Sequence, residues 1–262
     1  MIQNTYTKNV AYNLPIWVFN ETLIVKRNES PKVPMEKWKN HTTSHNSEDL
    51  FAYRNYFYGV SNGLVLETGI GQFSSTFFFE SVADWRSIHV EIDGNVFKQL
   101  LHRRPNSINV HGALCSSSRE VHFVPSKHET QGIYEFLPKE FLKLWHPQLL
   151  DNPQKVKELQ PLLCIPVSKL LSLIGIKHID LWIMDNHLGD GSDTEVLQGL
   201  DLNQQSISVI TFHESRELVN DNHSKPNENK VHILEKLGYN CDMLKAAMRW
   251  CVHKAFVPSK MP

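Results

Sequence analysis

Gly63-Leu-Val-Leu-Glu-Thr-Gly-Ile-Gly71 is the stretch of the chain that decides the fold. An apolar strand is expected to end at Glu67, and Gly69 and Gly71 form a Gly-x-Gly turn directly behind it. A second apolar strand ends in Glu91, 20 residues after Gly71. In open α/β sheets, such glycines let the backbone approach a ligand closely, and the second acid reaches a pair of ribose hydroxyls. The pattern predicts a site for a nucleoside-bearing small molecule.

Strands and helices alternate along the rest of the chain. Further strands are expected at 108–114, 120–124, 179–184, 206–212 and 252–257, and helices at 49–58, 76–83, 94–104, 166–174, 193–200 and 227–237. This alternation predicts an α/β fold with a doubly wound, mainly parallel sheet. We expect residues 1–47 to form an N-terminal extension and residues 48–262 to form the domain.

The segment 130–157 interrupts the alternation. It is rich in aromatic residues and contains two prolines, which predicts an inserted loop with short helices. Such a loop either walls a substrate pocket or is a packed surface insertion.

Composition narrows the class of protein. The 262 residues have 41% hydrophobic and 21% charged content, as in ordinary globular domains. The net charge of −1 argues against nucleic acid as the main partner. No run of 18 apolar residues is present, so no membrane span is expected.

The four cysteines, Cys115, Cys164, Cys241 and Cys251, form no C-x-x-C pair. A zinc ribbon is therefore not expected, and a disulfide framework is unusual in a chain of this size. We predict four partly buried free thiols.

The sequence does not decide in which cellular compartment the protein resides. No secretory signal is visible at the N-terminus, which slightly favours the cytoplasm. The Asn-x-Ser/Thr sequons favour the Golgi or another secretory lumen instead, and they begin at Asn20, Asn28, Asn40 and Asn222.

The motifs together resemble one family. The run from Asn62 to Gly71, the helix Ser-Ser-Thr-Phe-Phe-Phe-Glu80 and the strand that ends in Glu91 resemble the FkbM family of S-adenosylmethionine-dependent methyltransferases. Two later segments are similar to further family signatures: Ile-Asp-Leu-Trp-Ile-Met-Asp185 with Glu-Val-Leu-Gln-Gly199, and Ile-Leu-Glu-Lys-Leu-Gly-Tyr239. The resemblance covers about residues 48–257 and implies a Rossmann-like, seven-stranded methyltransferase sheet.

The resemblance also implies roles for single residues. Glu67, Gly69 and Gly71 would cradle the methionine end of S-adenosylmethionine, and Glu91 would bind the ribose hydroxyls. Ala113 and Leu114 would flank the adenine, and Asp185 would face the site of methyl transfer. The implied reaction is O-methylation of a sugar or another hydroxylated small molecule.

Two departures from the family pattern leave a rival function open. Gln72 stands where the family has an acid, and the segment after Asp185 is longer by about three residues than the family pattern. The alternative is a catalytically degenerate methyltransferase fold that serves as a binding or scaffold module. A nicotinamide-dependent oxidoreductase is disfavoured, because Ser74 replaces the third glycine of that fingerprint.

For two further groups of candidate site residues, a structural role is an alternative to a functional one. His213 follows a strand at the expected functional edge and is a candidate general base, although a lone histidine there can also be structural. Asp185, His187, Asp190 and Asp193 suggest a divalent cation, but their spacing does not match a calcium loop. Loop solvation and helix capping explain these residues as well, and we predict no metal site.

Overall fold

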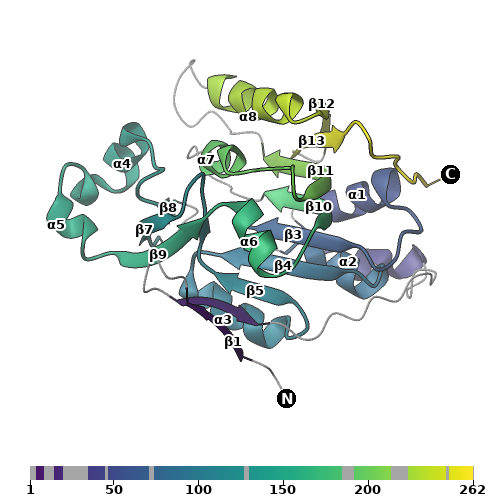
Figure 1. The fold of residues 1–262 in the computed structure, drawn as a ribbon, viewed down its shortest axis with the longest axis horizontal. Coiled ribbons are helices and arrows are strands. Elements are labelled where there is room, and N and C mark those ends of the chain that lie inside the picture. The colour runs from purple at the N-terminus through teal and green to yellow at the C-terminus, as the bar shows by residue number, and fades with distance from the viewer. Residues whose placement is uncertain are drawn as a thin grey trace.

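The computed structural model describes residues 4–8, 15–19, 35–44, 47–70, 74–126, 130–184, 192–213, 224–245 and 248–261. Its core is one twisted sheet with helices on both faces, and a second, smaller sheet lies at one end (Figure 1).

The main sheet has nine strands in the order β1-β2-β5-β4-β3-β10-β11-β13-β12 within the described residues. The five central strands are parallel: β5 (Ile108–His111), β4 (Arg86–Glu91), β3 (Leu64–Thr68), β10 (His178–Met184) and β11 (Ser206–His213). The hairpin of β12 (Tyr239–Lys245) and β13 (Met248–His253) adds two antiparallel strands beside β11. The seven strands from β5 to β12 in this order are therefore mainly parallel, as expected, but the whole sheet has two strands more than the seven that the resemblance implied.

The N-terminal segment extends this sheet beyond the prediction. β1 (Asn4–Lys8) and β2 (Pro15–Phe19) form a hairpin, and β2 pairs antiparallel with β5. The apolar run Pro15–Phe19 thus becomes the strand that joins the edge strand β1 to β5.

Alternating side chains of the parallel strands enter two different cores, as the two-residue period of a strand requires. On one face lie α6 (Val167–Leu173), α7 (Ser192–Gln198) and α8 (Ser224–Lys236). On the other lie the 3-10 helix η1 (Met35–Asn40), α1 (Glu48–Tyr56) and α2 (Thr76–Val82). α3 (Gly94–Arg103) connects β4 to β5. Helices on both faces confirm the doubly wound arrangement.

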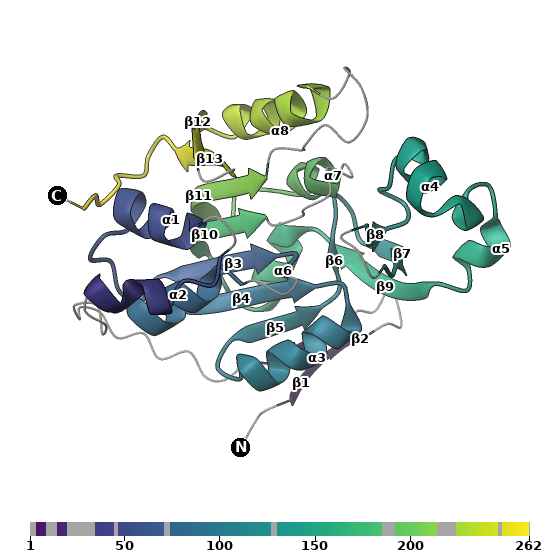
Figure 2. The ribbon, with the colours of Figure 1, turned by 180° about the vertical axis from the view of Figure 1, so that it is seen from behind.

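The segment between β5 and α6 builds the smaller sheet. Its order is β6-β9-β7-β8, formed by β6 (Ala113–Leu114), β9 (Gln160–Ile165), β7 (Arg119–Val124) and β8 (Gly132–Ile133). Three short helices follow β8: α4 (Lys139–Trp145), η2 (Pro147–Leu149) and α5 (Pro153–Val156). Figures 1 and 2 both show this insertion at the end toward which the arrowheads of β10 and β11 point.

Several predicted boundaries are wrong. The strand expected at 108–114 splits, because β6 leaves the main sheet and pairs with β9. The strand expected at 252–257 begins earlier as β13, and β12 and β9 were not predicted.

The prediction of four free thiols is also wrong. Cys115 is bonded to Cys164, and Cys241 is bonded to Cys251. The β6–β9 pairing brings the first pair together across 49 residues, and the β12–β13 hairpin brings the second pair together across 10. Only the tertiary pairing of the strands reveals these bonds.

Candidate functional site

The ends of β3 and β4 bring the two predicted acids to one edge of the sheet. β3 and β4 are parallel neighbours, and Thr68 pairs with Val90 in register. Glu67 and Glu91 therefore both stand at the carboxyl ends of adjacent strands, the edge at which open α/β sheets bind ligands. The amide of Gly69 donates to the carbonyl of Val90 at 3.3 Å, which ties the start of the turn to β4.

Gly69 has the backbone conformation that a turn of this kind demands. Its φ is +78°, in the left-handed region where a side chain adds strain. Gly71 and Gln72, the next positions of the turn, lie outside the described residues, as does Asp185. The cradle predicted for the methionine end is thus described only at Glu67 and Gly69, and its contact with a ligand stays a prediction.

The carboxylate of Glu67 is fully buried and binds the start of α2. One oxygen accepts from the amide of Ser75 at 2.7 Å, and the other accepts from the hydroxyl of Ser74, also at 2.7 Å. A carboxylate at the first amides of a helix offsets their missing partners. Glu67 therefore holds the glycine turn against α2, which is a structural role beside any contact with a ligand.

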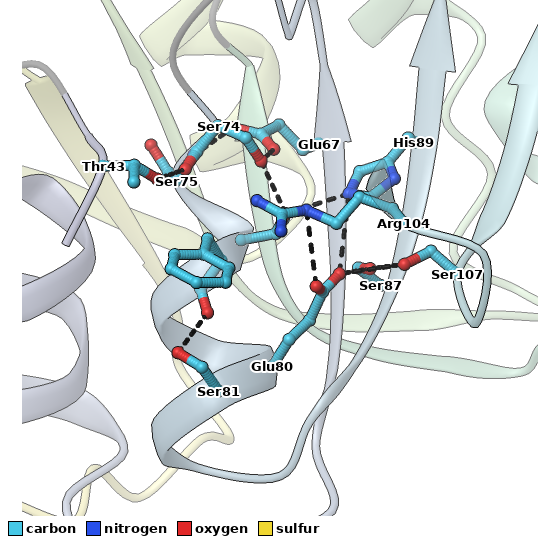
Figure 3. Close-up of polar contacts among 12 residues, drawn as sticks. Thr43, Glu67, Ser74, Ser75, Glu80, Ser81, Ser87, His89, Arg104 and Ser107 are labelled. Carbon is cyan, nitrogen blue, oxygen red and sulfur yellow. Dashed lines mark hydrogen bonds and ion pairs between the residues drawn. The ribbon is translucent and has the colours of Figure 1, made fainter. Parts of the chain in front are cut away.

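A buried polar network extends from this turn along the α2 face of the sheet (Figure 3). Ser74 contacts the hydroxyl of Thr76 at 2.8 Å, and Thr76 contacts Nε2 of His89 at 2.9 Å. Nδ1 of His89 lies 2.8 Å from Oδ1 of Asn109, whose amide nitrogen donates to two backbone carbonyls. Oδ1 of Asn109 therefore accepts, and the ring of His89 donates from Nδ1.

Burial determines the charge of His89. Desolvation lowers the pKa of His89 below its ordinary value, although Glu80 nearby acts in the opposite direction. Glu80 lies 3.9 Å from the ring, accepts from the hydroxyls of Ser87 and Ser107, and faces Nε of Arg104 at 3.5 Å. A neutral ring with its proton on Nδ1 then accepts from Thr76.

Glu91 ends β4 beside the N-terminus of α3. It is 2% exposed, and one carboxylate oxygen accepts from the amide of Asp93 at 2.8 Å. Asp93 in turn caps α3 by accepting from the amides of Asn95 and Val96. The second predicted acid is thus fixed in place at the mouth of the β4–α3 connection.

A cavity of about 610 Å³ opens between α3 and the small sheet, beside the β4–α3 connection that follows Glu91; Glu91 itself is not among its lining residues. Its lining comes from the start and face of α3, the end of β5, the end of β7 and the start of β9: Asp93, Gly94, Asn95, Phe97, Lys98, Leu101, His111, Phe123, Pro125, Glu158, Leu159 and Gln160. This volume suits a nucleoside, and the mixture of apolar walls with a few polar groups is typical of small-molecule sites. The segment 130–157 itself contributes no lining residue; the strands on either side of it do.

His111 and Phe97 form an aromatic wall of the cavity. Their rings stack with centroids 5.1 Å apart and planes 17° apart. Burial lowers the pKa of His111, so the ring is neutral near pH 7, and Nε2 donates to the carbonyl of Ile92 at 3.3 Å. A flat, uncharged stack of this kind suits contact with a planar ring.

Ala113 and Leu114, the residues predicted to flank adenine, are both buried in β6. Ala113 packs in the apolar cluster that Ile92 adjoins, whereas Leu114 belongs to the main core. Successive strand residues point to opposite faces, so their side chains cannot both face one ligand. Their contact with adenine stays a prediction.

The structure also shows a charged pair that the sequence did not reveal. Nζ of Lys230, on α8, lies 3.0 Å from Oδ2 of Asp193 on α7 and donates to the carbonyl of His213 at 3.2 Å. Lys230 is 2% exposed and Asp193 is 5% exposed. Asp193 was predicted to cap a helix. The sequence contained one signal for a buried charge: Lys230 lies on the same helical stripe as Leu234 and Leu237, where an apolar residue is expected.

His213 lies at the end of β11, at the same carboxyl edge, and is half-buried. The Asp193–Lys230 pair holds its backbone. A role as general base stays a prediction, because Glu214 and the nine residues after it lie outside the described part of the chain.

The described residues contain no group of three or more His, Cys, Asp or Glu side chains that could hold a metal ion. Asp185, His187 and Asp190 fall outside them. No helix in the described part of the chain is long and apolar enough to cross a membrane.

Comparisons with known proteins add little. No protein-family model matches the chain, and no curated protein matches it. Among solved structures, the chain is similar to the Methanococcus jannaschii fibrillarin pre-rRNA processing protein, with 10% identity over 97% of each chain and a TM-score of 0.44. This likeness is too weak to inform the function of the chain.

Proposed function

We propose that the protein is an S-adenosylmethionine-dependent methyltransferase of FkbM type that methylates a hydroxyl oxygen on a sugar or another small molecule. One observation carries the proposal. Two buried carboxylates, Glu67 and Glu91, end neighbouring parallel strands on either side of the left-handed Gly69. A cavity of nucleoside size opens beside the β4–α3 connection that follows the second of them.

The described residues fit the cofactor. Glu91 would accept from the ribose hydroxyls, the Glu67–Gly71 turn would hold the methionine end, and the His111–Phe97 wall would face the adenosine. When bound, S-adenosylmethionine supplies an electrophilic methyl group. The chain then has to bring an acceptor oxygen into line with that methyl carbon and exclude water, and alignment of this kind lowers a barrier substantially.

Two residues are proposed for the acceptor side, and of these His213 belongs to the described part of the chain. Asp185 follows β10 directly and would orient the acceptor. His213 ends the neighbouring strand β11, where it would take the proton from the acceptor hydroxyl. Both belong to the unit 48–262, with residues 1–47 as its extension.

Calorimetric titration with S-adenosylhomocysteine tests the donor site. Glu91→Gln is expected to weaken binding by about 10- to 150-fold, the loss of hydrogen bonds to a charged acceptor. Glu120→Gln is the matched control, since Glu120 is an exposed carboxylate on β7 in the small sheet, whereas Glu91 is buried at the end of β4 in the main sheet. Absence of binding by the unmodified chain, or equal binding by both variants, would overturn the proposal.

A binding module without turnover is the second candidate. It is favoured by the contacts of Glu67, whose two oxygens stabilise the start of α2 whether or not a reaction occurs. Incubation with radiolabelled donor and a panel of hydroxylated acceptors separates the two. Donor binding with no methyl transfer across the panel would favour the module.

A further inference from the structure

A single carboxylate on α7 holds the segment that follows β6. Oε1 of Glu195 accepts from the amide of Ser116 at 3.1 Å, from its hydroxyl at 2.6 Å, and from Nη2 of Arg119 at 2.6 Å. The backbone at Ser116 follows directly upon Ala113 and Leu114, the residues predicted to flank adenine. Glu195 thus connects α7 to the adenine side of the proposed donor site.

Gly199, the residue directly after α7, brings the end of this helix into close backbone contact with the same segment. A Cβ at position 199 would lie 2.3 Å from the carbonyl oxygen of Cys115, far inside van der Waals distance. Only glycine permits that approach. The spacing of Glu195 and Gly199 therefore has a geometric reason. Glu195 binds the amide of Ser116, and Gly199 leaves room for the carbonyl of Cys115.

The opposite side of the segment is fixed independently. β6 pairs with β9 through Ala113 and Leu114, the amide of Cys115 donates to Ile165 at 3.1 Å, and Cys115 is disulfide-bonded to Cys164. The segment is thus held between the small sheet and α7, so its position depends on both.

The charge of Glu195 strengthens the contact. Burial opposes ionisation of Glu195, but hydrogen bonds from Ser116 and Arg119 outweigh it and lower its pKa below the ordinary value. Arg119 also lies over the ring of Phe136, 5.4 Å from its centroid, which orients the guanidinium. An ionised acceptor with three donors makes stronger hydrogen bonds than a neutral one.

We infer that Glu195 is a positioning residue that sets the adenine end of the donor site, with Gly199 as the space that lets α7 reach it. The inference rests on the proposed function. Glu195 touches no ligand itself; it acts through the backbone of Cys115 and Ser116. Loss of its charge is expected to let the adenine-flanking segment shift while the rest of the donor turn stays in place.

Calorimetric titration of the full chain with S-adenosylhomocysteine and with adenosine tests this inference. Glu195→Gln is expected to raise the Kd for both ligands by the same factor, roughly tenfold, because the change affects the adenine end, which both ligands contain. Gly199→Ala is expected to do the same, since its Cβ displaces Cys115. Glu135→Gln is the control: that carboxylate lies in the insertion, not on α7, and contacts His122, away from β6.

The stoichiometry of binding separates positioning from general unfolding. A merely structural role lowers the fraction of protein that binds and leaves the Kd of that fraction unchanged. A positioning role changes the Kd at full stoichiometry and raises the KM for the donor without lowering kcat at saturation. If the unmodified chain binds and both α7 variants retain its Kd, the inference is wrong while the proposed function stands. If the unmodified chain binds neither ligand, the proposed function is wrong, and the inference that rests on it is wrong as well.

Discussion

Replacement of Lys230 by methionine removes a buried cation at the carboxyl edge of the sheet. Methionine has nearly the length of the lysine stem, so the change leaves the packing of α8 largely intact. It leaves the carboxylate of Asp193 without the ammonium that lies 3.0 Å away. It also removes the donor to the carbonyl of His213 and the contact with the ring of Phe212, 4.5 Å from its centroid.

The size of the effect follows from burial. With side chains 3% and 8% exposed, neither partner regains much solvation when the other is removed. Loss of one partner of such a pair costs about 3 to 5 kcal/mol. For a chain of this length, each kcal/mol lowers the melting temperature by about 2 to 4 °C, which gives a fall of roughly 6 to 20 °C. The double variant Lys230→Met/Asp193→Asn removes both charges and is expected to recover most of the loss.

Urea unfolding of the four proteins in this double-mutant cycle measures the free energy of coupling between the two residues. Lys236→Met is the control, because Lys236 is exposed on the same helix and is expected to change stability by less than about 0.5 kcal/mol. A loss below about 1 kcal/mol for Lys230→Met, or additive effects in the double variant, would refute the reasoning that this pair is a buried and mutually dependent unit.

Three other perturbations have defined outcomes. Because burial lowers the pKa of His89 in the folded chain, the unfolded chain binds more protons below about pH 6.5. Stability is therefore expected to fall as the pH drops from that value, and His89→Gln should flatten this slope in urea titrations at pH 7 and pH 5.5. Gly69→Ala, at φ +78°, is expected to cost about 1 to 2 kcal/mol in the same assay, and an unchanged midpoint would contradict the turn geometry. Replacement of both cysteines by alanine is expected to cost about 3 kcal/mol for Cys241–Cys251 and about 4 kcal/mol for Cys115–Cys164, in line with their loops of 10 and 49 residues; a larger loss for the shorter loop would contradict the loop-entropy account.

Local sequence patterns were sufficient for the parallel part of the sheet. β3, β10 and β11 are short apolar runs bounded by glycine, acid or turn residues, and a strand buried on both faces must read in this way. Helices such as α3 were visible through their apolar spacing and, for α3, through Pro105, which follows the helix; the cap at Asp93 became visible only in the structure. These elements could be predicted because each is determined by residues close to it in the sequence.

The missed elements depend on distant partners. β9 contains a proline and an apolar run that reads equally well as part of a helix, and it becomes a strand by pairing with β6 and β7. β12 is an irregular strand with a shift of register between Asn240 and Met243, so its alternation is broken. Both disulfides belong to these pairings, which explains why cysteine spacing alone led to the wrong prediction.

The candidate site divides in the same way. Glu67, Gly69 and Glu91 were predictable, because the carboxyl ends of adjacent parallel strands must meet at one edge. The hydrogen bonds that Glu67 accepts from Ser74 and Ser75 were not predictable, because they depend on how the chain after the glycine turn folds back against β3. The Asp193–Lys230 pair joins residues 37 positions apart on two helices, and the charge on the apolar stripe of α8 did not by itself identify Asp193 as its partner.

The two halves of the proposed site meet on α7. Asp193 and Glu195 are two positions apart, about 200° around a helix, so one reaches α8 and the end of β11 while the other reaches the segment after β6. A helix of seven residues is too short to be stable by itself, and its place is set by such tertiary contacts. α7 begins at Ser192, and the chain on its N-terminal side carries Asp185, the residue proposed for the acceptor side. The donor side and the acceptor side of the site therefore share one support, and a change at either contact is expected to be felt at both.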